Sequence, residues 1–118
     1  MAEHIDFGTG GENLAADWLI EKGYEILHRN WRYSRYEVDI IAVKDNFLHF
    51  IEVKTRNFSP FGYPEDSVRK KKFKNLQRAA DQYIFMHPAH KWIQYDILAI
   101  TLFPDKDPEY FLITDVFL

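Results

Sequence analysis

The stretch that decides the fold is residues 36–56, YEVDIIAVKDNFLHFIEVKTR, where charged residues interrupt two otherwise apolar runs. An unpaired charge in a dry interior costs several kcal/mol. Asp39, Glu52 and Lys54 must therefore be paired, in contact with solvent, or bound to a metal ion. The secondary structure decides among these alternatives, because it determines which side chains meet.

Two strands joined by a tight turn explain this stretch. Residues 36–43 alternate between polar and apolar before becoming fully apolar, and residues 48–55 follow the same pattern around the charged positions. Lys44, Asp45 and Asn46 form a short, turn-favouring segment between them. We therefore predict an antiparallel hairpin.

The flanking sequence predicts two helices and three further strands. Residues 11–22 carry apolar side chains at helical spacing and stop at Gly23, which suits a helix C-terminal cap. A long helix is predicted after the loop of residues 57–64, with its N-cap in residues 65–67 and its end near residues 87–88. The further strands are predicted over residues 24–33, 92–101 and 110–117.

The element order α-β-β-β-α-β-β predicts one mixed sheet flanked by helices, in the α/β or α+β class. The segment between the third and fourth strands is long enough for a right-handed parallel crossover. At 118 residues the chain fits one domain, residues 1–118, which buries about two thirds of its unfolded surface.

Composition narrows the class of protein. Apolar residues make up 47% of the chain, which indicates a globular protein and not a disordered one. No apolar run reaches membrane-spanning length and no secretory signal is present, so we expect no membrane contact. The lack of cysteine excludes disulfides and thiolate metal sites and favours a cytoplasmic location. The net charge of −3 hides a basic cluster between Arg69 and Arg78.

Strand alternation places the charged residues of the hairpin. Glu52 and Lys54 are predicted to point the same way, and Asp39 lies across from residues 50–52 if the strands pair through the predicted turn. Two carboxylates this close repel unless a cation lies between them. The alternation predicted for residues 36–43 puts Glu37, Asp39 and Ile41 on one face of the sheet, and Val38, Ile40 and Ala42 on the other.

These carboxylates are candidate metal ligands. Asp39 and Glu52, together with water, supply the oxygen ligands that Mg²⁺ or Mn²⁺ accepts. Lys54 adds an ammonium group that would orient or deprotonate an attacking water, or offset charge on a phosphorane, in metal-assisted phosphodiester hydrolysis. Glu12 lies on the helix face predicted to meet the sheet, so it is a further candidate ligand, directly or through water.

Each of these residues also has a simpler interpretation. An isolated Glu-x-Lys is usually a cross-strand ion pair at the rim of a sheet. Glu37 is either an outer-shell residue of the site or a partner of Arg35 or Arg56. Asp96, in a strand predicted to be buried, is expected to cap or pair with a basic residue. Three charges converging on one face, with Glu12 nearby, favour a metal site.

Basic residues beside this site favour contact with nucleic-acid phosphates. The alternative is that the basic run of the long helix is only a solvated helix face. The predicted nucleic-acid-binding residues are Arg56, Arg69, Lys70, Lys72, Lys74 and Gln77, extended by Arg32 and Arg35.

The same residues carry a resemblance to known nucleases. Asp39, followed after twelve intervening residues by Glu52-Val53-Lys54, resembles the PD-(D/E)xK nuclease core, with Val38 in place of the proline. A preceding helix that bears Glu12 is similar to the arrangement in archaeal-type Holliday junction resolvases. The resemblance implies that Asp39, Glu52 and Glu12 bind a divalent metal and that Lys54 assists the reaction.

A closer resemblance covers residues 8 to about 100. The pattern G-x-x-G-E-N-x-A-A-x-x-L from Gly8, Arg29-Asn30-Trp31, residues 37–42 (EVDIIA) and residues 50–56 (FIEVKTR) looks like the YraN-like family of uncharacterised bacterial proteins. This family implies a restriction-endonuclease-like fold, three layers α-β-α around a central mixed sheet. It also implies a predicted nuclease activity.

The leading hypothesis is therefore a Mg²⁺- or Mn²⁺-dependent endonuclease that hydrolyses DNA phosphodiester bonds, with branched or structured DNA as a candidate substrate. The alternative is a non-catalytic nucleic-acid-binding module on the same fold. A third hypothesis is a protein-interaction domain with no nucleic-acid partner. Because junction-cutting enzymes need two active sites, the analogy also leads us to expect a homodimer.

Overall fold

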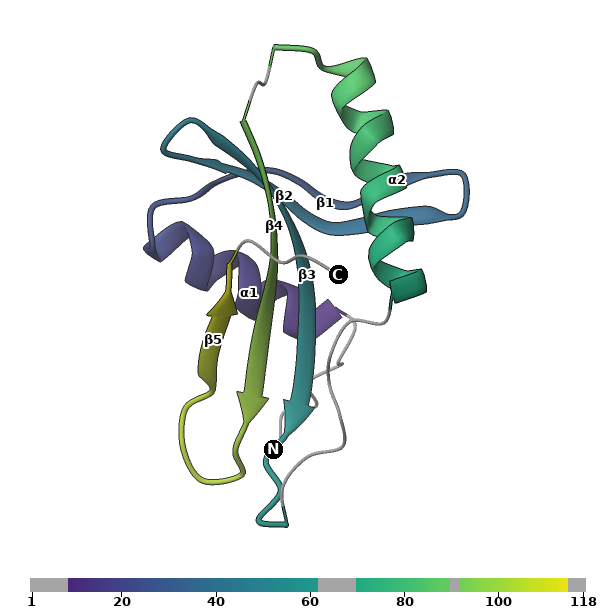
Figure 1. Cartoon of the computed structure of the whole chain (residues 1–118). Helices are drawn as coiled ribbons and strands as arrows, with labels where there is room; N and C mark the ends of the chain where they lie inside the picture. The colour runs from purple at the N-terminus through teal and green to yellow at the C-terminus, as the bar shows by residue number, and fades with distance from the viewer. Residues whose placement is uncertain (1–8, 62–69, 90–91, 115–118) are drawn as a thin grey trace.

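The computed structural model describes residues 9–61, 70–89 and 92–114, which form one five-stranded sheet with two helices (Figure 1). The predicted element order α-β-β-β-α-β-β is confirmed. The elements are α1 (Thr9–Glu21), β1 (Glu25–Tyr33), β2 (Tyr36–Lys44), β3 (Phe47–Asn57), α2 (Lys70–Met86), β4 (Trp92–Leu102) and β5 (Glu109–Ile113).

The strands lie in chain order across the sheet, β1-β2-β3-β4-β5. All neighbouring strands are antiparallel except β3 and β4, which pair in parallel through the α2 crossover, as predicted. The β2–β3 turn contains Asp45 and Asn46 with φ of 53° and 68°. Two consecutive residues with positive φ suit a two-residue hairpin turn, because this turn matches the twist of the strands.

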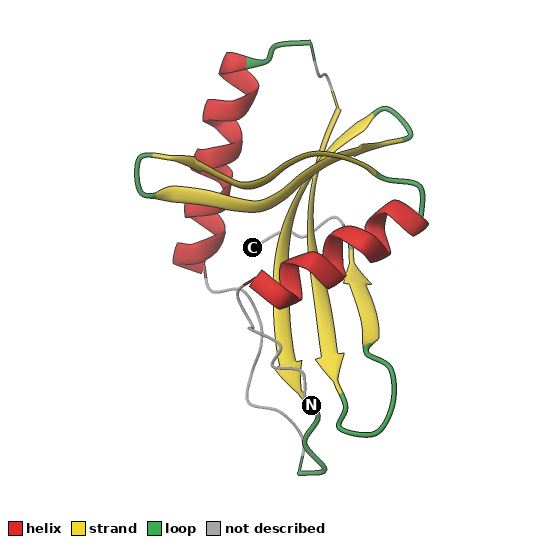
Figure 2. Cartoon of the chain, turned by 180° about the vertical axis from the view of Figure 1, so that it is seen from behind, coloured by secondary structure: helices red, strands yellow, loops and turns green. Residues whose placement is uncertain are grey.

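The two helices cover opposite faces of the sheet, which confirms the predicted α-β-α layering (Figures 1 and 2). The core under α2 contains Leu76, Ala79 and Tyr83 of the helix with Phe50 of β3. The core under α1 contains Ala15, Ala16 and Leu19 of the helix with residues of β2, β3 and β4, among them Ile40, Ile51 and Leu98. The central strands are therefore buried on both faces, which explains their nearly continuous apolar sequence.

The predicted helix ends agree with the structure where it describes them. At the end of α1, Gly23 has a φ of 98°, and the amides of Gly23 and Tyr24 donate to the carbonyls of Ile20 and Leu19 at 3.0 Å each. These two bonds are the pair that defines a Schellman cap. The predicted N-cap of α2 in residues 65–67 lies outside the described residues, and β5 ends at Ile113, within the longer strand predicted to residue 117.

One prediction about β2 is wrong: Val38 and Ile40 do not share a face. Val38 packs in the core under α2, whereas Ile40 packs in the core under α1. The same break separates Glu37 from Ile41. The break coincides with an irregularity in the neighbouring strand: Asn30, between the pairs Arg29–Ile40 and Trp31–Val38 and so opposite Asp39, has a φ of 53°. Left-handed backbone turns a strand locally, and the side-chain alternation of β2 changes at the same position.

Helix α1 packs closely against β3 at Gly11. A Cβ atom on Gly11 would lie 2.2 Å from Thr55 Oγ1, which is itself buried without a hydrogen-bond partner in the described part of the chain. We expect Gly11→Ala to lower the free energy of unfolding by about 1–3 kcal/mol, although alanine is intrinsically the better helix former. Urea denaturation measures the change. The double variant Gly11→Ala/Thr55→Ala should recover part of the loss, and an unchanged or raised stability of Gly11→Ala would contradict this packing.

Neither helix, over its described residues, is long and apolar enough to cross a membrane.

Candidate metal and nuclease site

The site begins where β2 and β3 separate. Their ladder runs from Lys44 opposite Phe47 to Ile40 opposite Ile51, so Asp39 is the first residue of β2 beyond the last pair. Asp39 Oδ2 accepts a hydrogen bond from the backbone N–H of Val53 at 2.8 Å. The carboxylate thus takes the place of a strand partner and is held in a defined position at the separation point.

Glu52 and Lys54 continue β3 beyond this point. Alternation places both on the face of Leu48 and Phe50, the side of the sheet that α2 covers farther along. The Glu52 residue is 7% exposed, whereas Lys54 is half-buried. A nearly buried Glu52 and a half-buried Lys54 therefore follow one another on one face of β3, beyond the last β2–β3 pair.

The pKa of the Asp39 carboxyl is strongly shifted by its surroundings. Burial raises the pKa of its carboxyl, and the negative charge of Glu52 raises it further. The Val53 amide lowers this pKa, while Glu12 and Glu37 add smaller upward contributions, and the result is a pKa of about 7 instead of 3.8. The other three acids thus all act on Asp39 electrostatically. Such a strongly shifted carboxyl is typical of a functional site.

The two outer acids take different places. Glu12 lies half-buried in the first turn of α1, next to Gly11, where the helix approaches Thr55 of β3. Within the described residues, three acidic or histidine side chains nowhere come close enough to ligate one ion. The assignment of Asp39, Glu52 and Glu12 as ligands of one ion, with Glu12 binding directly or through water, therefore stays a prediction.

Glu37 pairs with Arg32, and not with Arg35 or Arg56, the two partners considered from the sequence. Its Oε2 accepts a hydrogen bond from Arg32 Nε at 3.0 Å, which makes an exposed ion pair. Arg32 and Glu37 are directly opposite in the β1–β2 ladder, so the cross-strand register selects this pair over Arg35 or Arg56.

The pKa of Asp39 makes stability depend on pH. Since the folded state holds this proton more tightly than the unfolded chain does, metal-free protein should lose stability as pH rises from about 4 to about 7. We expect Asp39→Asn to raise the free energy of unfolding at pH 8 by on the order of 2 kcal/mol, and to have little effect at pH 4. Denaturant unfolding in EDTA measures both values. The exposed Asp105→Asn is the matched control, and a gain from Asp39→Asn that is equal at both pH values would contradict the shifted pKa.

The structure places only part of the predicted phosphate-contacting surface. Lys74 is exposed on α2 and Gln77 is half-buried. Arg56 Nε donates to Thr101 Oγ1 on β4 at 3.3 Å, so this guanidinium is braced against the neighbouring strand. Arg69 lies outside the described residues, and the side chains of Lys70 and Lys72 are also outside the description.

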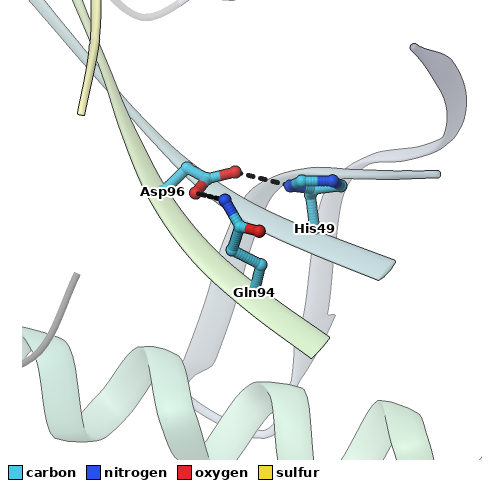
Figure 3. Close-up of polar contacts among 3 residues, drawn as sticks. All are labelled: His49, Gln94 and Asp96. Carbon is cyan, nitrogen blue, oxygen red and sulfur yellow. Dashed lines mark hydrogen bonds and ion pairs between the residues drawn. The ribbon is translucent and has the colours of Figure 1, made fainter. Parts of the chain in front are cut away.

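A buried polar cluster on the α1 side of the sheet was predicted only in part. Asp96 was expected to pair with a basic residue, and its partner is His49, with Nδ1 2.6 Å from Asp96 Oδ2 (Figure 3). Gln94 Nε2 donates to the other carboxylate oxygen at 2.9 Å. Both side chains of the pair are nearly or fully buried, 7% and 0% exposed. The parallel register of β3 and β4 brings them together, and nothing in the local sequence indicates that register.

A second contact that the sequence did not reveal fixes α1 to the sheet. Arg29 of β1 donates a short hydrogen bond from Nη2 to Asn13 Oδ1. Asn13 directly follows Glu12, and Arg29 directly precedes Asn30, whose left-handed backbone lies opposite Asp39. One hydrogen bond therefore connects the segment that carries Glu12 with the strand irregularity that lies across from Asp39.

Comparison with known proteins identifies the family. The family model described as "Uncharacterised protein family UPF0102" matches residues 11–100. A UPF0102 protein of Phocaeicola vulgatus is 45% identical over 108 residues, which are 92% of this chain and 88% of the relative. A UPF0102 protein of Flavobacterium psychrophilum is 43% identical over 100 residues, 85% of this chain and 84% of the relative. The predicted YraN-like resemblance is thereby confirmed, and the chain belongs to the UPF0102 family.

Proposed function

We propose that the protein is a divalent-metal-dependent endonuclease that hydrolyses DNA phosphodiester bonds. The observation that carries this proposal is the position of Asp39. Its carboxyl is fixed by the Val53 amide at the separation of β2 and β3, and its pKa is raised to about 7 by burial and by the neighbouring Glu52. Keeping several acids together in a partly buried place is unfavourable without a cation.

Mg²⁺ or Mn²⁺ fits this donor set. Hard divalent cations take carboxylate oxygens and retain waters, and they bind phosphate oxygens of a substrate. Asp39 and Glu52 are the residues that would hold the ion, with Glu12 acting through water. A bound cation would relieve the repulsion among these acids and would lower the pKa of Asp39 toward its usual value.

Lys54 supplies a positive charge that the carboxylates cannot. Its ammonium lies two residues after Glu52 on the same face, so it is near the position where a phosphate would meet the carboxylates. There it would orient the attacking water and offset the negative charge that develops on the phosphorus oxygens. The rigid β3–β4 pairing beneath Glu52 and Lys54 holds both side chains in place without reorganisation.

The substrate would approach over α2. The exposed Lys74, the braced Arg56 and Gln77 are the described members of the predicted phosphate-contacting set. Contacts of this kind fix the position of a nucleic-acid backbone and carry no base specificity. We therefore expect selection by the shape of the DNA, with branched forms as candidates, and not by sequence.

A cleavage panel tests the proposal. Duplex, single-stranded and four-way-junction DNA of equal length are incubated with the protein in Mg²⁺, in Mn²⁺ and in EDTA. Cleavage of at least one DNA in either metal and none in EDTA is expected. Binding without cleavage of any DNA would instead support the non-catalytic module.

A homodimer belongs to the junction-cutting form of this proposal, because two strands must be cut by two sites. The mass of the protein in solution, measured with and without junction DNA, distinguishes the forms. A monomer under both conditions would remove the junction-cutting form and leave a single-site nuclease.

A further inference from the structure

The β1–β2 hairpin turn carries a second concentration of positive charge, in which Glu37 pairs with Arg32. The hydroxyl of Tyr36 lies between two guanidiniums: Arg35 Nη2 is 3.4 Å and Arg78 Nη1 is 3.2 Å from the phenol oxygen. The Cζ atoms of Arg35 and Arg78 lie 5.4 Å and 5.9 Å from the centre of the Tyr36 ring. Arg35 belongs to the hairpin turn and Arg78 to α2, so the tertiary fold brings them together.

Among the residues that the structure describes, no carboxylate neutralises these two guanidiniums. Arg32, also in the hairpin, is paired with Glu37 at 3.0 Å. By contrast, neither Arg35 nor Arg78 has a carboxylate within 4 Å among the residues that the structure describes. Two cations that converge on one neutral oxygen repel each other, and the phenol compensates them only partly. The hydrogen bonds from Arg35 and then Arg78 lower the pKa of the Tyr36 hydroxyl, which is the response expected of strong positive potential.

A shallow pocket adjoins the pair. It has a volume of about 200 Å³ and is lined by Arg32, Ser34, Arg35 and Glu37. The hairpin turn extends past α2 in Figure 1, so this end of the β1–β2 ribbon stands clear of the helix. Arg35 therefore borders the pocket on one side and contacts Tyr36 on the other.

The chemistry of these groups selects a phosphate. A guanidinium presents its N–H donors in a planar fork that matches two phosphate oxygens, and two such forks exceed what one phenol oxygen can satisfy. A tyrosine hydroxyl that accepts from arginine still has its own hydrogen to donate. Two cations and one neutral donor would thus surround an incoming anion.

We propose that Arg35, Arg78 and Tyr36 form an anchor for one backbone phosphate of the nucleic acid, separate from the cleavage site. The proposal rests on the proposed function for its choice of nucleic acid as the ligand. Tyr36 precedes Asp39 by three strand residues, a spacing of about 10 Å. The anchored phosphate would therefore lie within a few nucleotides of the bond that is cut. The anchor would therefore set the distance between a held position on the DNA and the cut.

The test measures binding in EDTA, where metal-dependent cleavage cannot occur. The affinity of the protein for a labelled duplex of about 20 base pairs is determined over a range of NaCl concentrations, for the wild type and for Arg35→Gln/Arg78→Gln. Loss of one phosphate contact should lower the salt slope by about one and the affinity by about tenfold. Tyr36→Phe should weaken binding several-fold and leave the slope unchanged. The control Lys106→Gln, on the loop before β5, should change neither.

Several results would overturn the anchor. One is a double variant with the slope and affinity of the wild type, and another is no measurable DNA binding by the wild type. A third is inorganic phosphate that protects the wild type thermally, but not the double variant, while the DNA slopes agree, because the site would then serve a free anion. Failure of the anchor can be distinguished from failure of the proposed function. A reduced salt slope in the double variant, without cleavage by the wild type, keeps the anchor and removes the nuclease. Cleavage by the wild type, with an unchanged slope in the double variant, keeps the nuclease and removes the anchor.

Discussion

Asp39→Asn should lower the rate of metal-dependent DNA cleavage by at least about 100-fold. Asparagine keeps an oxygen that can accept the hydrogen bond from Val53, so the backbone geometry is retained while the charge that attracts the cation is removed. Lys54→Met should cause a loss of about 100-fold or more, because it removes the ammonium beside the reacting phosphate and keeps the length of the side chain. Single-turnover cleavage rates at saturating protein measure both effects.

The controls for these variants lie on the loop between β4 and β5. Asp105→Asn and Lys106→Met make the same chemical changes at exposed positions far along the chain from the acids, and they should keep the wild-type rate. Asp39→Asn is also expected to be more stable than the wild type at pH 8, so lost activity cannot be ascribed to unfolding. A cleavage rate of Asp39→Asn or Lys54→Met within about threefold of the wild-type rate would contradict the assignment of these residues.

Asp96→Ala should produce the largest loss of stability, about 3 kcal/mol or more in the free energy of unfolding. The fully buried carboxylate accepts from Gln94 and pairs with His49, so its removal leaves the buried His49 and the half-buried Gln94 without this partner. The cluster joins β3 to β4 on the face opposite Glu52. Urea unfolding of the metal-free protein measures the loss.

A double-mutant cycle separates the pair from simple loss of volume. If His49 and Asp96 stabilise each other, His49→Ala/Asp96→Ala should cost clearly less than the sum of the two single variants. Asp105→Ala, an exposed aspartate outside the core, should change the stability by less than about 0.5 kcal/mol. Additive losses at positions 49 and 96 would show that the two side chains act independently.

Much of the fold could be predicted because its signals are local. Gly23 marked the end of α1, and its left-handed φ of 98° is the conformation that glycine adopts most easily. Asp45 and Asn46 marked the β2–β3 turn, where both also have a positive φ. The spacing from this turn then placed Asp39 near Glu52, and the effect of the Glu52 charge on the pKa of Asp39 agrees with that placement.

The features that the sequence did not reveal depend on neighbouring strands. Strict alternation failed at Asp39, which lies across from the left-handed backbone of Asn30 in β1. The partner of Glu37 could not be chosen without the β1–β2 register, which sets Arg32 opposite it. Pairings of this kind join residues through tertiary contacts, and local periodicity carries no information about them.

Titration of the protein with Mn²⁺ by calorimetry tests the central claim, that Asp39 and Glu52 hold a divalent cation. Since Asp39 has a pKa of about 7, Mn²⁺ binding at pH 7 should release about half a proton, which is measured by comparing buffers of different ionisation enthalpy. The affinity should fall by about tenfold for each pH unit below 7. Binding should be lost in Asp39→Asn and kept in Asp105→Asn. Equal Mn²⁺ binding by the wild type and Asp39→Asn, or no binding by the wild type, would contradict the metal site.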